Sequence, residues 1–100
     1  MKLYSAKRDV ENRLIVTVDR KPLDPRFDIW THDVIFDCGH AGEAAAQLAL
    51  ALLADCLQND NLAKAHYQQF KWQIIFKLPH DRWRLTERQI MEILSKYSKS

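Results

Sequence analysis

The sequence predicts an α+β domain, in which a small antiparallel sheet of about three strands packs with three helices and the central helix is buried. Three observations lead to this class. Residues 44–57 include only two polar side chains, which is typical of a helix covered on most sides. Residues 14–18 are a β-branched run typical of a strand. Thr86 stands three residues before Gln89, the spacing of a capping box that opens a helix.

The sheet is expected to begin with a hairpin. Residues 3–6 start a short extended segment, and residues 14–18 have the strongest strand character in the chain. The charged residues 7–12 between them have the length of a hairpin connection. The two segments are therefore predicted to pair antiparallel.

A rigid turn and a third strand are expected next. Pro22 and Pro25 each fix φ and restrict the residue before them, so residues 19–26 are predicted to form neither a helix nor a central strand. Residues 34–36, Val-Ile-Phe, predict a third short strand that ends at Gly39 before the central helix.

The central helix is predicted to open at residues 41–43 and to close at residues 59–61, where Asn-Asp-Asn also caps the next helix. At about 100° per residue its polar side chains fall on one narrow stripe, which is the only face expected to meet water. That stripe consists of Glu43, Gln47, Ala51, Asp55 and Gln58.

The second helix is predicted over residues 62–77 and is stopped by Pro79. Opposite its core-facing side, Trp72 and Phe76 form a second apolar line. This line is either covered by another element or exposed as a contact surface. A third helix follows the capping box, and residues 98–100 are expected to fray.

Composition and charge place the chain among small globular proteins and exclude few functions. Its 100 residues suffice for a single domain, and only two glycines and three prolines argue against disorder. The net charge of +2 is too small to indicate a nucleic-acid or membrane partner. No apolar run reaches the roughly 20 residues of a membrane span, and the first residues lack a signal-peptide core, so a cytoplasmic location is expected. Cys38 and Cys56 are expected to be reduced.

The sequence contains no constellation that predicts catalysis. Asp37, Cys38 and His40 lie close together with His32 upstream, but zinc sites usually show two ligand pairs. A dyad of Cys38 and a histidine lacks any local signature of a nucleophile. Two glycines at 39 and 42 could hold an anion before a helix, or they simply let the chain turn into it. We therefore expect no enzymatic activity, no metal and no cofactor.

Two groups of residues are candidates for binding a macromolecule. The preferred partner is another protein, or a second copy of the chain in a homodimer, and the contact residues expected for it are Trp72, Phe76, Asp24, Arg26 and Asp28. The alternative partner is a nucleic acid, and the basic residues expected for it are Arg82, Arg84, Arg88, Lys64 and Lys71. Acidic residues lie among the latter group, so the protein partner is preferred.

Several motifs follow one another along the chain: P-L-D-P-R at 22–26, a glycine turn at 39–42, A-Q-L-A-L-A-L-L-A-D at 46–55, Y-Q-Q-F at 67–70, L-P at 78–79 and L-T-E at 85–87. As a set they resemble a family of small uncharacterised bacterial and phage proteins, known only as a domain of unknown function. The resemblance covers nearly the whole chain and implies a fold and a bacterial or mobile-element setting, without an activity.

The chain departs from the family pattern at two places. Residues 38–42 read C-G-H-A-G where family members usually have W-G-Y-G-G, and Trp72 and Phe76 stand where polar or small residues are expected. An aromatic patch would therefore be particular to this protein. We expect a non-enzymatic protein-interaction module, an accessory protein of phage or plasmid type that binds a host protein. A nucleic-acid-binding accessory protein is the alternative.

Overall fold

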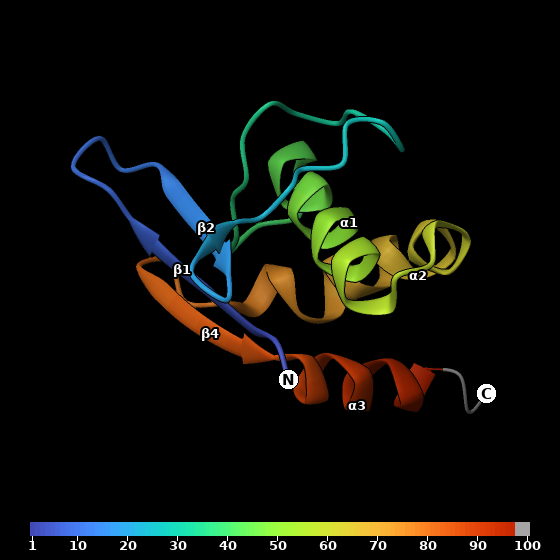
Figure 1. Ribbon diagram of the computed structural model, residues 1–100. Helices are drawn as coiled ribbons and strands as arrows, with labels where there is room; N and C mark the ends of the chain where they lie inside the picture. The colour runs from blue at the N-terminus through green and yellow to red at the C-terminus, as the bar shows by residue number, and fades with distance from the viewer. Residues whose placement is uncertain (98–100) are drawn as a thin grey trace.

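A four-stranded antiparallel sheet forms one layer of the structure, and the helices pack on one of its faces (Figure 1). The computed structural model describes residues 1–97. The predicted α+β class is confirmed, with four strands in place of about three. In chain order the elements are β1 (Leu3–Arg8), β2 (Leu14–Val18), β3 (Lys21–Pro22), α1 (Glu43–Leu57), α2 (Asp60–Gln73), the 3₁₀ helix η1 (Ile75–Lys77), β4 (Arg82–Thr86) and α3 (Glu87–Tyr97).

The sheet has the strand order β3-β2-β1-β4. The predicted hairpin is confirmed, because β1 and β2 pair antiparallel with Tyr4 opposite Val18 and Arg8 opposite Leu14. The short β3 lies at the edge, where a proline is tolerated because no further strand needs its missing N–H. Side chains of the longer strands alternate between the helix layer and the outer face.

The predicted third strand at residues 34–36 is wrong, and β4 is absent from the prediction. Two of the three side chains at 34–36 are exposed, so this β-branched run has no buried face that would select a strand. β4 instead pairs with the free edge of β1 and buries Trp83 and Leu85. The alternation in R-W-R-L-T is the sequence signal for this strand.

The central helix α1 is buried as predicted, with one error. Most of its side chains are inaccessible to water and form the centre of the core. Gln47 and Ala51, which the sequence places on a water-facing stripe, are fully buried. Of that stripe, only Glu43 and Gln58 are exposed, and Asp55 is half-buried.

The C-terminal end of α1 is tied to β1. Asp55 Oδ1 accepts hydrogen bonds from the hydroxyl of Tyr4 at 2.7 Å and from Lys2 Nζ at 3.0 Å. Burial and the bond to Asp55 both raise the pKa of Tyr4, so this hydroxyl stays protonated. The contact fixes the first strand on the helix layer.

Capping explains where α2 and α3 begin. Asn59 Oδ1 accepts the N–H of Leu62 at 3.1 Å. The predicted capping box is confirmed, because Thr86 Oγ1 accepts the N–H of Gln89 at 3.0 Å and Gln89 Oε1 accepts the N–H of Thr86 at 2.8 Å. α2 ends at Gln73, earlier than predicted, because the following turn tightens into η1.

Two further expectations concern the ends of the chain and its relation to membranes. The expected fraying of residues 98–100 lies outside the described residues. Across residues 1–97, each helix is too short or too polar to cross a bilayer.

Replacing Leu50 with alanine tests the central place of α1. Leu50 is fully buried, so the substitution leaves a cavity and should lower the free energy of unfolding by about 2–5 kcal/mol. The control is Leu62→Ala on the exposed surface of α2, which should change that free energy by about 0.5 kcal/mol or less. Urea denaturation followed by tryptophan fluorescence measures both. Equal losses for the two variants would contradict the buried position of α1.

Candidate functional site

One buried side chain organises the segment between β3 and α1, residues 23–42, which we call the connecting loop. Gln47 of α1 is fully buried and bonds four backbone groups of this loop. Its Nε2 donates to the carbonyls of Pro25 at 2.7 Å and Trp30 at 3.0 Å. Its Oε1 accepts from the N–H groups of His32 at 2.6 Å and Asp33 at 3.3 Å. A buried amide is costly unless its donors and acceptors are paired, so Gln47 and the loop stabilise each other.

Arg26 ties the start of the connecting loop to α2. Its backbone is left-handed, with φ at +59°, and Asp24 Oδ1 accepts its N–H at 2.9 Å. Its guanidinium donates to both carboxylate oxygens of Asp28 at 3.0 Å and to Asp60 Oδ2 at 2.9 Å. Hydrogen bonds from Arg26 lower the pKa of Asp28. Asp24, Arg26 and Asp28, predicted as contact residues, therefore shape the loop, while Asp24 and Asp28 remain exposed.

A chain of three side chains fixes the middle of the connecting loop to both helices. His32 Nδ1 lies 2.6 Å from Glu43 Oε2, and His32 Nε2 lies 2.7 Å from the hydroxyl of Tyr67. Each ring nitrogen of His32 therefore lies within hydrogen-bond distance of one side chain. The order of carboxylate, imidazole and hydroxyl resembles a catalytic relay. Here both ring nitrogens are used to anchor the loop.

The ordered connecting loop presents large apolar side chains to solvent. Trp30 is 61% exposed, and its ring lies 6.3 Å from that of His32, centroid to centroid. Phe27, Val34 and Ile35 are also exposed. Figure 1 shows the loop arching over the N-terminal part of α1. A segment held by buried hydrogen bonds thus carries apolar groups that contribute little to the core.

The predicted cluster of Asp37, Cys38 and His40 is engaged within the fold. Asp37 accepts from the Arg8 guanidinium at 2.7 Å and pairs with His40 Nε2 at 3.1 Å. Burial alone would raise the pKa of Asp37, but hydrogen bonds from Arg8, the Cys38 N–H and His40 hold it below its usual range. Burial raises the pKa of the Cys38 thiol, which disfavours the nucleophilic thiolate. Among the described residues, no group of three such side chains could hold a metal ion.

The two glycines before α1 have conformational roles. Gly39 has φ at +79°, and its N–H donates to the Ile75 carbonyl at 3.0 Å. The Gly42 N–H donates to His40 Nδ1 at 2.9 Å, and a β-carbon at Gly42 would lie only 3.0 Å from that nitrogen. Both N–H groups already have partners, which favours the conformational interpretation over an anion site.

The second apolar line, formed by Trp72 of α2 and Phe76 of η1, is exposed. Trp72 is 56% exposed and Phe76 is 45% exposed, with their ring centroids 5.9 Å apart. Lys71 Nζ lies 5.3 Å from the centroid of the Trp72 ring, within the range of a cation–π interaction. The interpretation in which another element covers this line is therefore wrong.

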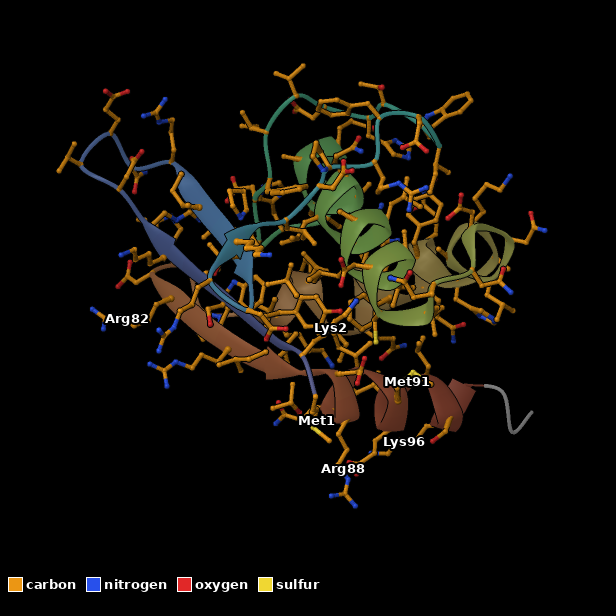
Figure 2. The ribbon with its side chains drawn as sticks, viewed as in Figure 1. Met1, Lys2, Arg82, Arg88, Met91 and Lys96 are labelled. Carbon is orange, nitrogen blue, oxygen red and sulfur yellow. The ribbon has the colours of Figure 1, made fainter. Side chains whose placement is uncertain are left out.

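The basic residues predicted for nucleic acid do not form one surface. Arg82 and Arg84 share the outer face of β4, and Figure 2 shows Arg82 projecting away from the helices. Arg88 belongs to α3, where it pairs with a glutamate one turn along the helix at 3.5 Å. Lys64 and Lys71 belong to α2. Arg82 and Arg84 thus share one face of β4, whereas the other three residues lie on α2 and α3.

Residues 4–96 match the model of a family of unknown function, DUF6166. The chain belongs to the DUF6166 family. The match includes the connecting loop, Gln47 and all of the sheet except Leu3, so the site described above lies within the family's domain. The resemblance to a domain of unknown function is thereby confirmed at the level of the family. No curated protein and no solved structure matches the chain.

Sequence reasoning missed the residues that order the loop of this DUF6166 member. Gln47 is the only polar residue of α1 between Glu43 and Asp55. A lone polar side chain in the middle of a buried helix is the signal that could identify it, because such a side chain needs internal partners. His32 and Tyr67 offer no comparable signal, since they are 35 residues apart.

Replacing Gln47 with methionine tests the hydrogen bonds that hold the loop. Methionine has a similar size, but it leaves two backbone carbonyls and two N–H groups of the loop without partners. We expect the free energy of unfolding to fall by about 3 kcal/mol or more, since each buried unpaired group costs about 1–3 kcal/mol. The matched control is Gln69→Met, on the exposed surface of α2. A stability loss no larger than that of Gln69→Met would show that Gln47 does not order the loop.

Proposed function

We propose that this member of the DUF6166 family is a non-enzymatic protein-interaction module that binds its partner through the connecting loop. The observation that carries the proposal is the fixation of an irregular 20-residue segment, 23–42, by the buried Gln47 while Trp30 points to solvent. Structureless segments of this length inside a small domain are uncommon and usually serve function.

The energetics of binding favour such a loop. Binding to a mobile segment costs conformational entropy, because the segment must become ordered. The hydrogen bonds of Gln47 and the ion pairs of Arg26 have already ordered the connecting loop. Tryptophan is among the residues that contribute most to protein interfaces. Phe27 and Trp30 would form the apolar centre of the contact, with Asp24 and Asp28 as its polar rim.

Support for a non-enzymatic role comes from the polar clusters. His32 uses both ring nitrogens to hold Glu43 and Tyr67, and the Asp37 carboxylate is shared by Arg8 and His40. These groups have structural partners within the fold. We propose that the protein binds its partner without a cofactor.

The resemblance to bacterial and phage proteins suggests the setting. We propose that the protein is an accessory protein of phage or plasmid type that works in a bacterial cytoplasm, and that its partner is a host protein.

The aromatic pair Trp72 and Phe76 supplies a second candidate surface. Both rings are exposed and lie against each other, which suits contact with another apolar surface. We propose that this pair contacts a second copy of the chain, in a homodimer. The partner-binding loop and this pair can be separated by mutation.

Quantitative affinity capture from a lysate of the native host tests the proposal. The immobilised protein is compared with Trp30→Ser, Trp72→Ser and the control Val10→Ser, whose side chain is fully exposed at the hairpin tip. We expect Trp30→Ser to retain at least about tenfold less of the partner, because loss of an interface tryptophan commonly costs more than 1.4 kcal/mol. Val10→Ser should retain the partner as the wild type does.

Two results would contradict the assignment to the loop. Unchanged retention by Trp30→Ser would exclude Trp30 as a contact. If only Trp72→Ser fails to retain the partner, the contact surface is on α2 and not on the loop. Light scattering would then show whether the retained protein is a second copy. Circular dichroism of each variant confirms that the fold is intact.

A further inference from the structure

The outer face of the sheet, away from the helices, gathers basic side chains. Strand alternation places Lys7 of β1 and Arg82 and Arg84 of β4 on this face. These three residues line a hollow, and Arg20, in the turn between β2 and β3, also lines it. We call Lys7, Arg20, Arg82 and Arg84 the basic face. Figure 2 shows Arg82 extending outward from it.

The positive charges of the basic face are not neutralised by ion pairs with carboxylates of residues 1–97. Within residues 1–97, none of its four cations forms an ion pair. Lys7 and Arg82 even lie directly opposite each other in the β1–β4 register, and like charges at such positions are destabilising. The other arginines all have carboxylate partners; they are Arg8, Arg13, Arg26 and Arg88. The fold therefore keeps uncompensated positive charge on one surface.

The charge of the molecule is distributed unevenly. The chain has a net charge of +2, and the four cations of the basic face taken together with Asp19 and Asp81 account for all of it. Asp81 also lines the hollow, but its side chain is exposed and bonds His80 at 3.1 Å. Asp19, beside Arg20, accepts the N–H of Leu3 at 2.9 Å. Neither carboxylate pairs with a cation of the basic face.

We propose that the basic face binds the phosphate backbone of double-stranded DNA. This surface is separate from the connecting loop and from the aromatic pair Trp72 and Phe76, so the inference does not rest on the proposed function.

The side chains around the cations are suited to phosphate oxygens. Ser5 lies opposite Thr17 on one side and Arg84 on the other, so two hydroxyls and a guanidinium share one row across the sheet. Arginine, lysine and hydroxyl side chains are among the groups that contact the phosphates and sugars of nucleic acids. Arg82 and Arg84 are two residues apart, hence about 7 Å apart along the strand, and can contact neighbouring phosphates.

The composition of the face favours a duplex over other anionic partners. Proteins that bind single strands stack bases on exposed aromatic rings, whereas Trp83 of β4 is buried beneath the sheet. Protein interfaces usually have an apolar centre, whereas Ile15 is the one exposed large apolar side chain that lines the hollow. Duplex DNA carries about one negative charge per 1.7 Å of helix axis, which matches a face rich in cations and hydroxyl groups.

Fluorescence anisotropy with a short labelled DNA duplex tests the inference. If the four cations contact phosphates, the affinity of the wild type should fall on the order of 100-fold between about 50 and 200 mM salt. Arg82→Glu/Arg84→Glu should weaken binding at low salt by on the order of 100-fold, because two contacts become repulsive. The control Lys64→Glu/Lys71→Glu changes the net charge equally on α2 and should weaken binding by less than about threefold.

The design separates loss of binding from loss of folding. Arg82→Glu places a carboxylate opposite Lys7, so the sheet should remain folded, and thermal unfolding checks this directly. Unweakened binding by Arg82→Glu/Arg84→Glu, or equal weakening by the α2 control, would overturn the inference. Single-stranded DNA, an RNA duplex and polyglutamate are added as competitors. Displacement by any of them at a lower concentration than by unlabelled DNA duplex would overturn the assignment to double-stranded DNA.

Discussion

The hydrogen bonds of Gln47 are the interaction on which the arrangement of the molecule depends. α1 is covered on nearly every side, so the polar side chain at its centre must find its partners inside the protein. It finds them in the backbone of the connecting loop, between residues 25 and 33. The same bonds let an irregular segment cover an apolar helix with its backbone groups paired. The burial of α1 and the order of the connecting loop therefore depend on the same hydrogen bonds.

The fold exposes two kinds of surface, which differ in their chemistry and in the contacts that position their side chains. The connecting loop exposes aromatic groups such as Trp30, and its shape is set by long-range hydrogen bonds to α1 and α2. The basic face exposes cations such as Arg82 and Arg84, and their positions are set by strand register alone. Because the two surfaces depend on different contacts, each can be altered without the other.

Elements with local signals could be predicted from the sequence, and elements held by distant contacts could not. The hairpin, the buried α1 and the capping box at Thr86 follow from propensity, periodicity and spacing within a few residues. The order of the connecting loop could not be predicted in this way. A helical wheel places Gln47 on the water-facing stripe and cannot show that the backbone of the loop covers it. Residues 34–36 have strand propensity but pair with no strand of the described sheet, whereas β4 pairs with β1. Likewise, the sequence groups Arg82 and Arg84 with basic residues of the helices, whereas their grouping with Lys7 depends on strand register.

Backbone order in the wild-type protein tests the central claim most directly. We would measure ¹⁵N relaxation order parameters along the chain, using α1 as the rigid reference. If Gln47 holds the connecting loop, residues 26–33 should have order parameters near 0.85, the value of rigid backbone. Values below about 0.6 would mean that the segment is flexible on the picosecond to nanosecond timescale. That result would contradict an ordered loop, and with it the basis for a preformed binding surface.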